Sequence, residues 1–173
     1  MLRTTPSIGS RGAGRRISGR AQLDAIADPY EAHLKPREPT VCRRCLAVYH
    51  HGRWQWATRP AGATQALCPA CRRIEDKAPA GILTLHGAFP REQANAIIAL
   101  LRHQEQAERE DHPLNRIIDI VENSDAITVT TTDIHLPRRL GEAVRRTLHG
   151  TLDIRFDDTS YFVRVDWRAA RKR

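Results

Sequence analysis

Apolar residues recur along the second half of the chain with the periods of strands and helices. Residues 82–86 and 126–132 alternate apolar and polar side chains or are rich in β-branched ones, which predicts two strands. Residues 91–110 carry apolar side chains at the i, i+3, i+4 and i+7 spacing of a helix, and residues 114–121 show a similar pattern. We therefore expect a strand, two helices and a second strand in this part of the chain.

A third amphipathic helix is expected after Asp133, whose side chain is placed to cap it. Its apolar positions are Leu136, Leu140, Val144 and Leu148, and its polar positions include Arg138, Arg139, Arg145 and Arg146. Gly150 ends this helix, and residues 152–156 and 161–167 then predict a hairpin. The fold class is therefore α+β, with the order β-α-α-β-α-β-β over residues 81–168.

The front of the chain has little apolar patterning. Residues 1–37 are rich in Gly, Ser, Thr and Arg, and they bury too little apolar surface to offset the entropy lost on ordering. We expect a disordered basic tail followed by a Pro-containing linker there. Residues 38–80 hold every cysteine and predict a metal-binding module. The α/β domain follows over residues 81–168, and residues 169–173 form a basic C-terminal tail.

Composition adds a strong positive charge to this picture. The 173 residues include 28 Lys and Arg against 20 Asp and Glu, for a formal net charge of +8. Residues 1–37 and 38–90 each carry a net charge of +4, whereas residues 91–149 carry −2. Nearly all the basic residues are arginines, which bind phosphate bidentately and stack on bases. A polyanion is therefore the expected partner, contacted mainly by the front half of the chain.

The four cysteines form two Cys-x-x-Cys pairs, Cys42/Cys45 and Cys68/Cys71, with 22 residues between them. Two residues between cysteines let a tight turn aim both thiolates at one point, and two such turns supply a tetrahedral set of sulfurs. Disulfides need an oxidising compartment, and a thioredoxin-like redox pair needs one motif rather than two. We therefore predict one structural zinc ion, whose closed coordination leaves no position for catalysis.

The residues around the cysteines predict how the module is built. Residues 46–49 and 53–56 are strand-like runs around a His-His-Gly turn, and residues 71–77 predict a short helix. Knuckle, hairpin, knuckle and helix is the order of a treble clef, and a plain zinc ribbon is the alternative. Because the α/β domain has apolar faces of its own, we expect it to remain folded when the metal module does not.

The candidate RNA contacts are arginines and two tryptophans. Trp54 and Trp56 alternate on one face of the predicted hairpin, where they form either a small core over the metal or a stacking platform for bases. The expected contacts are Arg43, Arg44, Arg53, Trp54, Trp56, Arg72, Arg73, Arg138 and Arg139. Asp133 is interpreted as a cap and His135 as a surface residue of the first helical turn. A deep polar pocket beside these two residues would instead favour a hydrolase or a nucleotide-binding enzyme.

Several motifs together carry a family resemblance. They are Cys42-x-x-Cys45, Cys68-Pro-Ala-Cys71-Arg72-Arg73-Ile74, Pro79-Ala80-Gly81, His112-Pro113-Leu114-x-Arg116-Ile117 and Val129-Thr130-Thr131-Thr132-Asp133-x-His135-Leu136-x-Arg138-Arg139. In these motifs, which span about residues 28–168, the chain resembles a small family of mostly uncharacterised bacterial zinc-ribbon proteins. More distantly, it is similar to the front part of the large-ribosomal-subunit export adapters named for nonsense-mediated decay. That resemblance implies zinc and a ribosomal or RNA partner. That family has more than one metal site and further domains, and none of its residues implies catalysis here.

The leading hypothesis is a non-catalytic, zinc-stabilised protein that binds RNA or associates with the ribosome. The alternative is a protein-interaction adapter in which the zinc module is a scaffold. An enzyme is the third hypothesis, because the chain has no Gly-rich phosphate loop, nucleophile elbow or Cys/His dyad. No stretch reaches the roughly 18 consecutive apolar residues of a membrane helix, and no secretory signal is visible, so a cytoplasmic location is expected.

Overall fold

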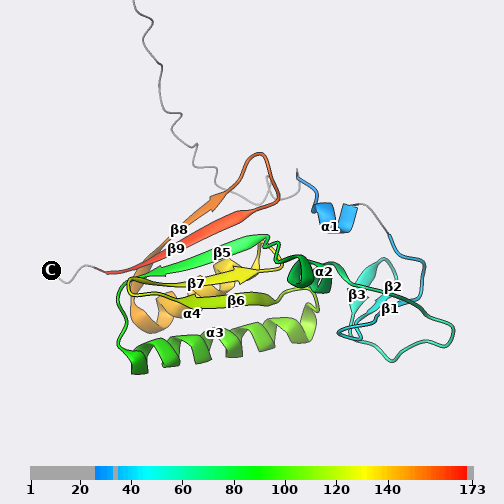
Figure 1. Ribbon diagram of the computed structural model, residues 1–173, viewed down its shortest axis with the longest axis horizontal. Helices are drawn as coiled ribbons and strands as arrows, with labels where there is room; N and C mark the ends of the chain where they lie inside the picture. The colour runs from blue at the N-terminus through cyan, green and yellow to red at the C-terminus, as the bar shows by residue number, and fades with distance from the viewer. Residues whose placement is uncertain (1–25, 33–34, 171–173) are drawn as a thin grey trace, which may run out of the picture.

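The computed structural model describes residues 26–32 and 35–170, which form a small metal-binding module beside a larger α/β layer (Figure 1). The strands of the module are β1 (Thr40–Cys42), β2 (Val48–His50), β3 (Arg53–Gln55) and β4 (Thr64–Ala66), paired in the order β3-β2-β1-β4. The short helix α1 (Pro29–Ala32) contacts α2 (Pro69–Asp76), which follows the second cysteine pair. The predicted hairpin and the helix after Cys68 are therefore both present.

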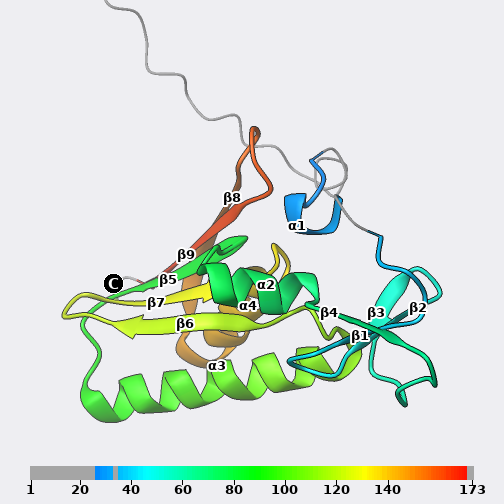
Figure 2. The ribbon, with the colours of Figure 1, turned by 45° about the vertical axis from the view of Figure 1, so that its right-hand side comes forward.

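The α/β layer is a five-stranded sheet with two helices on one face. Its strands are β5 (Gly81–His86), β6 (Ile117–Glu122), β7 (Ala126–Thr131), β8 (Gly150–Phe156) and β9 (Val163–Ala169), in the order β6-β7-β5-β9-β8. Strand β5 runs parallel to β9, and every other neighbouring pair is antiparallel. Helices α3 (Arg91–Asp111) and α4 (Leu136–Leu148) pack against each other and against the sheet (Figure 2). Strands β5, β6 and β7 with the helix α3 form a split β-α-β unit.

The second helix predicted over residues 114–121 is wrong, because residues 117–122 form the strand β6. The apolar residues Ile117, Ile118, Ile120 and Val121 satisfy both a helical and an extended pattern over so short a run. The hydrogen bonds to β7 select the strand over the helix. The pairing has one irregularity, between Ile117 and Asp119. Isoleucine and valine are also stiff at χ1, which favours the strand. The observed order from β5 onward is therefore β-α-β-β-α-β-β.

The core confirms the predicted phase of the third helix. Leu136, Leu140 and Val144 of α4 are fully buried and pack in one cluster with Leu83, Leu85, Ile97 and Leu101. Arg138, Arg139, Arg145 and Arg146 are exposed, as expected. Gly141 lets α4 lie close to the sheet, because a Cβ at this position would lie 2.8 Å from Leu152 Cδ2. The close approach of α4 fixes the arginines on the side away from the sheet.

Residues 26–32, which lie within the predicted disordered tail, contact the metal module instead. Asp28 forms an ion pair with Arg73 of α2, and both side chains are buried. The Tyr30 hydroxyl donates a hydrogen bond of 2.9 Å to Asp76. These contacts give the segment before the module a fixed place. Residues 1–25 and 171–173, which hold the rest of the predicted basic tails, lie outside the described residues.

Within residues 26–32 and 35–170, none of the helices has the length and apolar character needed to cross a membrane.

Candidate metal centre and nucleic-acid interface

The two cysteine pairs are brought together by the first strand and the second helix. Cys42 ends β1, and the turn after it brings Cys45 back toward it, with the Leu46 amide donating to the Cys42 carbonyl at 2.9 Å. Cys68 is the N-cap of α2, and its Sγ accepts a hydrogen bond of 3.4 Å from the Cys71 amide in the first turn. The Cys68 amide in turn donates to Cys42 Sγ. All four sulfurs lie within 4.8 Å of one another.

This geometry fits a metal ion held by four thiolates. All four cysteines are free, and the 3.7 Å between Cys45 Sγ and Cys68 Sγ is far from the roughly 2.05 Å of a disulfide. Four sulfurs at tetrahedral positions about 2.3 Å from a metal lie about 3.8 Å apart. Three of the cysteines are buried and Cys45 is partly buried, so the set is closed to solvent on most sides. The predicted ligand set therefore forms one cluster suited to a metal.

Arg116 links this cluster to the α/β layer. Its guanidinium donates from Nη1 to Cys71 Sγ at 3.2 Å and from Nε to the Pro113 carbonyl at 2.8 Å. Burial lowers the pKa of Arg116, but hydrogen bonding and the charge of the cysteine sulfurs outweigh this and hold the pKa above its usual value. A cation beside four thiolates compensates part of their negative charge. Leu114, two residues earlier, packs against the same cluster.

The two tryptophans have different neighbours. Trp54 is partly buried, packs against the cysteine cluster and lies 5.5 Å from the Tyr49 ring, centroid to centroid. Trp56 is 38% exposed, and its indole donates to the Arg109 carbonyl while the Arg109 guanidinium lies over the ring. Trp54 therefore belongs to the core of the module, which was one of its two predicted roles. Trp56 joins the module to the end of α3.

Arg73 does not belong among the candidate RNA contacts. It is only 3% exposed, its Nη2 pairs with Asp28 Oδ1, and its Nη1 donates to the Ala78 carbonyl at 3.0 Å. Its guanidinium also lies 4.1 Å from the centre of the Tyr30 ring. This arginine holds α1 on α2 and is covered by them, so its inclusion among the surface contacts is wrong. Arg43, Arg44, Arg53 and Arg72 are exposed, and Arg44 pairs with Glu75.

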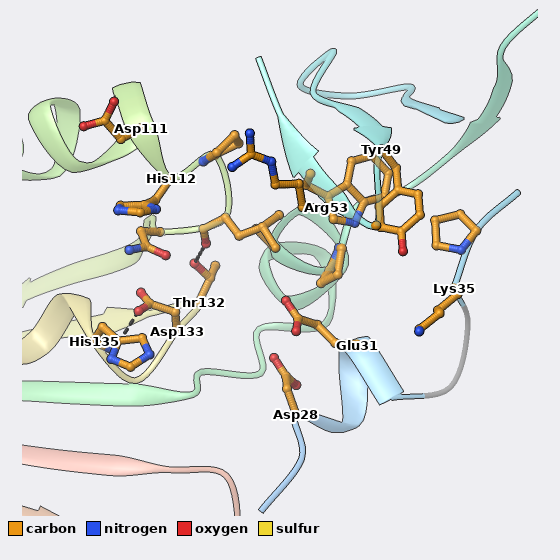
Figure 3. A pocket seen from close by; sticks show the side chains of 18 of the residues that line it. Asp28, Glu31, Lys35, Tyr49, Arg53, Asp111, His112, Thr132, Asp133 and His135 are labelled. Atoms are coloured by element: carbon orange, nitrogen blue, oxygen red, sulfur yellow. Dashed lines mark hydrogen bonds between the residues drawn. The ribbon is translucent and has the colours of Figure 1, made fainter. Parts of the chain in front are cut away.

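One hollow lies where the module meets the α/β layer, and a groove within that layer adjoins it. The junction hollow, of about 520 Å³, is lined by α1, the β2–β3 hairpin and the loops at residues 111–115 and 132–135 (Figure 3). The helix groove, of about 820 Å³, runs between α3 and α4 and carries Arg138, Arg139 and Arg146. Both are lined by His112, Asn115 and His135, so they form one continuous surface. This surface extends from Arg53 to Arg146.

Asp133 caps α4, as predicted. Its Oδ2 accepts from the His135 and Leu136 amides at 2.7 and 3.0 Å. Burial raises the pKa of Asp133, although the two backbone hydrogen bonds oppose the shift. Its Oδ1 is buried without a hydrogen-bond partner among the described residues. His135 is exposed, as expected, but it is the N-cap residue directly before the first turn of α4. Both residues line the junction hollow.

Sequence reasoning missed three residues of this region. They are Arg116 beside the metal cluster and Glu31 and Tyr161 in the wall of the junction hollow. A weak signal pointed to Arg116, since it is the single basic residue between Arg109 and Arg138. Glu31 and Tyr161 reach the hollow only through long-range packing, for which no local pattern exists.

Comparison of the chain with protein families, with curated proteins and with solved structures found no match in any of the three.

Proposed function

We propose that this is a non-catalytic, zinc-stabilised protein of the cytoplasm that binds RNA, either free or as part of the ribosome. Zinc is the metal that a closed set of four thiolates favours, and such a site stabilises a fold without supplying an open coordination position. RNA is the polyanion best suited to a chain with a net charge of +8 carried almost wholly by arginine.

The observation that carries this proposal is the charge balance of the helix groove. Its acidic residues Glu108 and Glu142 are already paired with Arg139 and Arg145. Arg138 and Arg146 form no ion pair with any described residue, and both line the groove. His112 and His135 add polar groups at the end that leads to Arg53. A phosphate backbone lying along α4 would neutralise the two unpaired arginines.

The test is a salt titration of single-stranded RNA binding by a double variant, Arg138→Ala with Arg146→Ala. Each phosphate contact contributes about 0.7 to the slope of log affinity against log salt on single strands, so the slope should fall by about 1.4. Arg91→Ala with Arg168→Ala is the matched control, because it removes the same charge from exposed arginines outside both hollows. An equal loss in both double variants would reject the groove as the binding site.

A second variant tests the contribution of the metal module. Arg43, Arg44 and Arg72 are exposed on it, and their joint replacement by Ala leaves all four thiolates in place. We expect the triple variant to bind RNA more weakly than the wild type, because the front half of the chain carries most of the net positive charge. If the wild-type protein does not bind RNA at low salt, the RNA proposal is rejected. The protein-interaction adapter is then the remaining non-catalytic hypothesis. Under the adapter hypothesis, Leu46, which follows the first cysteine pair and is 66% exposed, is the expected contact with a protein partner.

A catalytic function is the second candidate, on the strength of the junction hollow. Asp133 and His135 lie in its wall, and carboxylates and histidines are the usual groups of acid–base catalysis. Cleavage of the bound RNA by the purified protein, lost in a His135→Ala variant that still binds, would support this candidate over the non-catalytic one.

A further inference from the structure

Aromatic side chains gather in the junction hollow. The whole chain has only nine Phe, Trp and Tyr residues, and three of them, Tyr49, Trp54 and Tyr161, line this one cavity. Tyr49 is buried, and the other two are partly exposed. A volume of about 520 Å³ lies in the range of small-ligand sites. Aromatic walls of this kind accept flat rings, including nucleic acid bases.

Four carboxylates, those of Asp28, Glu31, Asp111 and Asp133, line the hollow together with the two cationic side chains of Lys35 and Arg53. Asp28 is engaged by Arg73, and Asp133 uses one oxygen to cap α4. The Glu31 carboxylate makes no hydrogen bond or ion pair with any side chain or amide of the described residues. Figure 3 shows Glu31 extending from α1 into the space between Tyr49 and Asp133. An ionised carboxylate offers two acceptor oxygens and no donor.

We infer that the junction hollow accepts one guanine base of the bound RNA, with Glu31 receiving the hydrogen bonds of its Watson–Crick edge. This inference rests on the proposed function. Guanine presents two neighbouring donors there, N1–H and the N2 amino group, which match the two oxygens of a carboxylate. Adenine, cytosine and uracil each place an acceptor beside a donor, so one of the two carboxylate oxygens would face a lone pair.

The neighbouring groove supplies what the rest of the nucleotide needs. The four carboxylates of the junction hollow outnumber its two cations, Lys35 and Arg53, so a neutral base enters the hollow more readily than a phosphate does. The phosphates would lie along Arg138 and Arg146, across the shared wall of His112, Asn115 and His135. The hollow has a net negative charge and the groove a net positive one, which suits the base and the phosphate of a single-stranded nucleotide respectively.

The experiment compares labelled eight-nucleotide RNAs that differ at one central position. The wild-type protein should bind oligouridine with one guanosine about tenfold more tightly than oligouridine alone, as a bidentate contact allows. Inosine at the same position lacks the N2 amino group and should fall between the two. Glu31→Gln replaces one acceptor oxygen by a donor, so it should abolish the guanosine preference and leave oligouridine binding within about twofold. Glu122→Gln makes the same charge change on β6, outside both hollows, and should keep the preference.

The outcomes separate this inference from the proposed function. Failure of every oligonucleotide to bind at low salt overturns the RNA proposal itself. Binding without a guanosine preference, an inosine affinity equal to that of guanosine, or a preference that persists in Glu31→Gln overturns the guanine site alone. The guanine site is also overturned if an arginine-containing peptide loses binding in Glu31→Gln while guanosine RNA binds the variant as well as the wild type. That result would assign the hollow to a protein partner. Equal melting temperatures of Glu31→Gln and wild type establish that any loss reflects the contact.

Discussion

Replacing Arg116 by Met should weaken metal binding and folding together. In the wild-type protein the buried guanidinium donates to Cys71 Sγ at 3.2 Å and to the Pro113 carbonyl at 2.8 Å. Methionine keeps a flexible apolar stem in the same space, but it removes both donors and the positive charge beside the thiolates. The variant therefore isolates what the cation contributes to the joint between the metal cluster and the α/β layer.

The expected loss in the free energy of unfolding follows from the two hydrogen bonds of Arg116 and from one opposing desolvation cost. Both contacts are donated by the charged guanidinium, and a hydrogen bond that involves a charged group contributes about 1.5–3 kcal/mol. Arg116 Nη2 is buried without a hydrogen-bond partner, and its desolvation cost subtracts from the stabilisation by the two contacts. Methionine has no such group, so the variant does not carry this cost. We expect a net loss of about 2–3 kcal/mol in the free energy of unfolding of the metal-loaded protein. The bond to the Pro113 carbonyl does not need the metal, so only the loss of the Cys71 contact, about 1.5–3 kcal/mol, lowers the metal affinity, by about 10- to 150-fold.

Chelator competition measures the metal affinity, and denaturant unfolding with and without metal measures the stability. Arg72→Met is the control, since it removes an exposed arginine next to Cys71 in sequence and should change stability by less than about 0.5 kcal/mol. Equal metal affinities of Arg116→Met and the wild type would refute the coupling. A stability loss of the same size in the metal-free protein would show that Arg116 acts through packing alone. If Arg116 couples the two parts in this way, metal removal should also lower the melting temperature of the α/β layer, unlike the independent stability expected from its own apolar faces.

Three further perturbations test the fold. Leu140→Ala should lower the free energy of unfolding by about 2–5 kcal/mol because the side chain is fully buried, whereas Val121→Ala, at a side chain 45% exposed, should change it by less than about 1 kcal/mol in the same denaturant titration. Gly81→Ala places a Cβ 2.5 Å from Pro137 Cγ and 2.9 Å from Val163 Cγ1, and should cost about 1–3 kcal/mol; an unchanged melting temperature would show that the neighbours yield freely. Hydrogen bonds from the Thr159 hydroxyl and amide lower the pKa of Asp157 from 3.8 to about 2, so its contribution to stability is complete above about pH 4 and is lost as the pH falls toward 2. Asp157→Asn should flatten the acid limb of the stability curve in that range, and the exposed Asp158→Asn should not.

Local features of the sequence determined the metal cluster and the third helix of the α/β layer. Two residues between cysteines set the direction of each thiolate pair within a single turn, so Cys42, Cys45, Cys68 and Cys71 could be assigned without knowledge of the rest of the chain. The phase of α4 was equally local, because a 3.6-residue period over 13 residues leaves one apolar face. Asp133 was identifiable as a cap by its place just before that face.

The tertiary structure decided the features that depend on contacts between distant segments. Residues 117–122 fit a helix or a strand by their own pattern, and only the neighbouring strand β7 supplies the hydrogen bonds that select the strand. Arg73 looked like any other arginine of a basic module, but Asp28 and Tyr30, more than 40 residues away, cover it. Arg116, Glu31 and Tyr161 reach the metal cluster or the junction hollow for the same reason. The burial and the contacts of a side chain depend on how the whole chain packs. A local sequence pattern therefore does not predict which distant residues will surround that side chain.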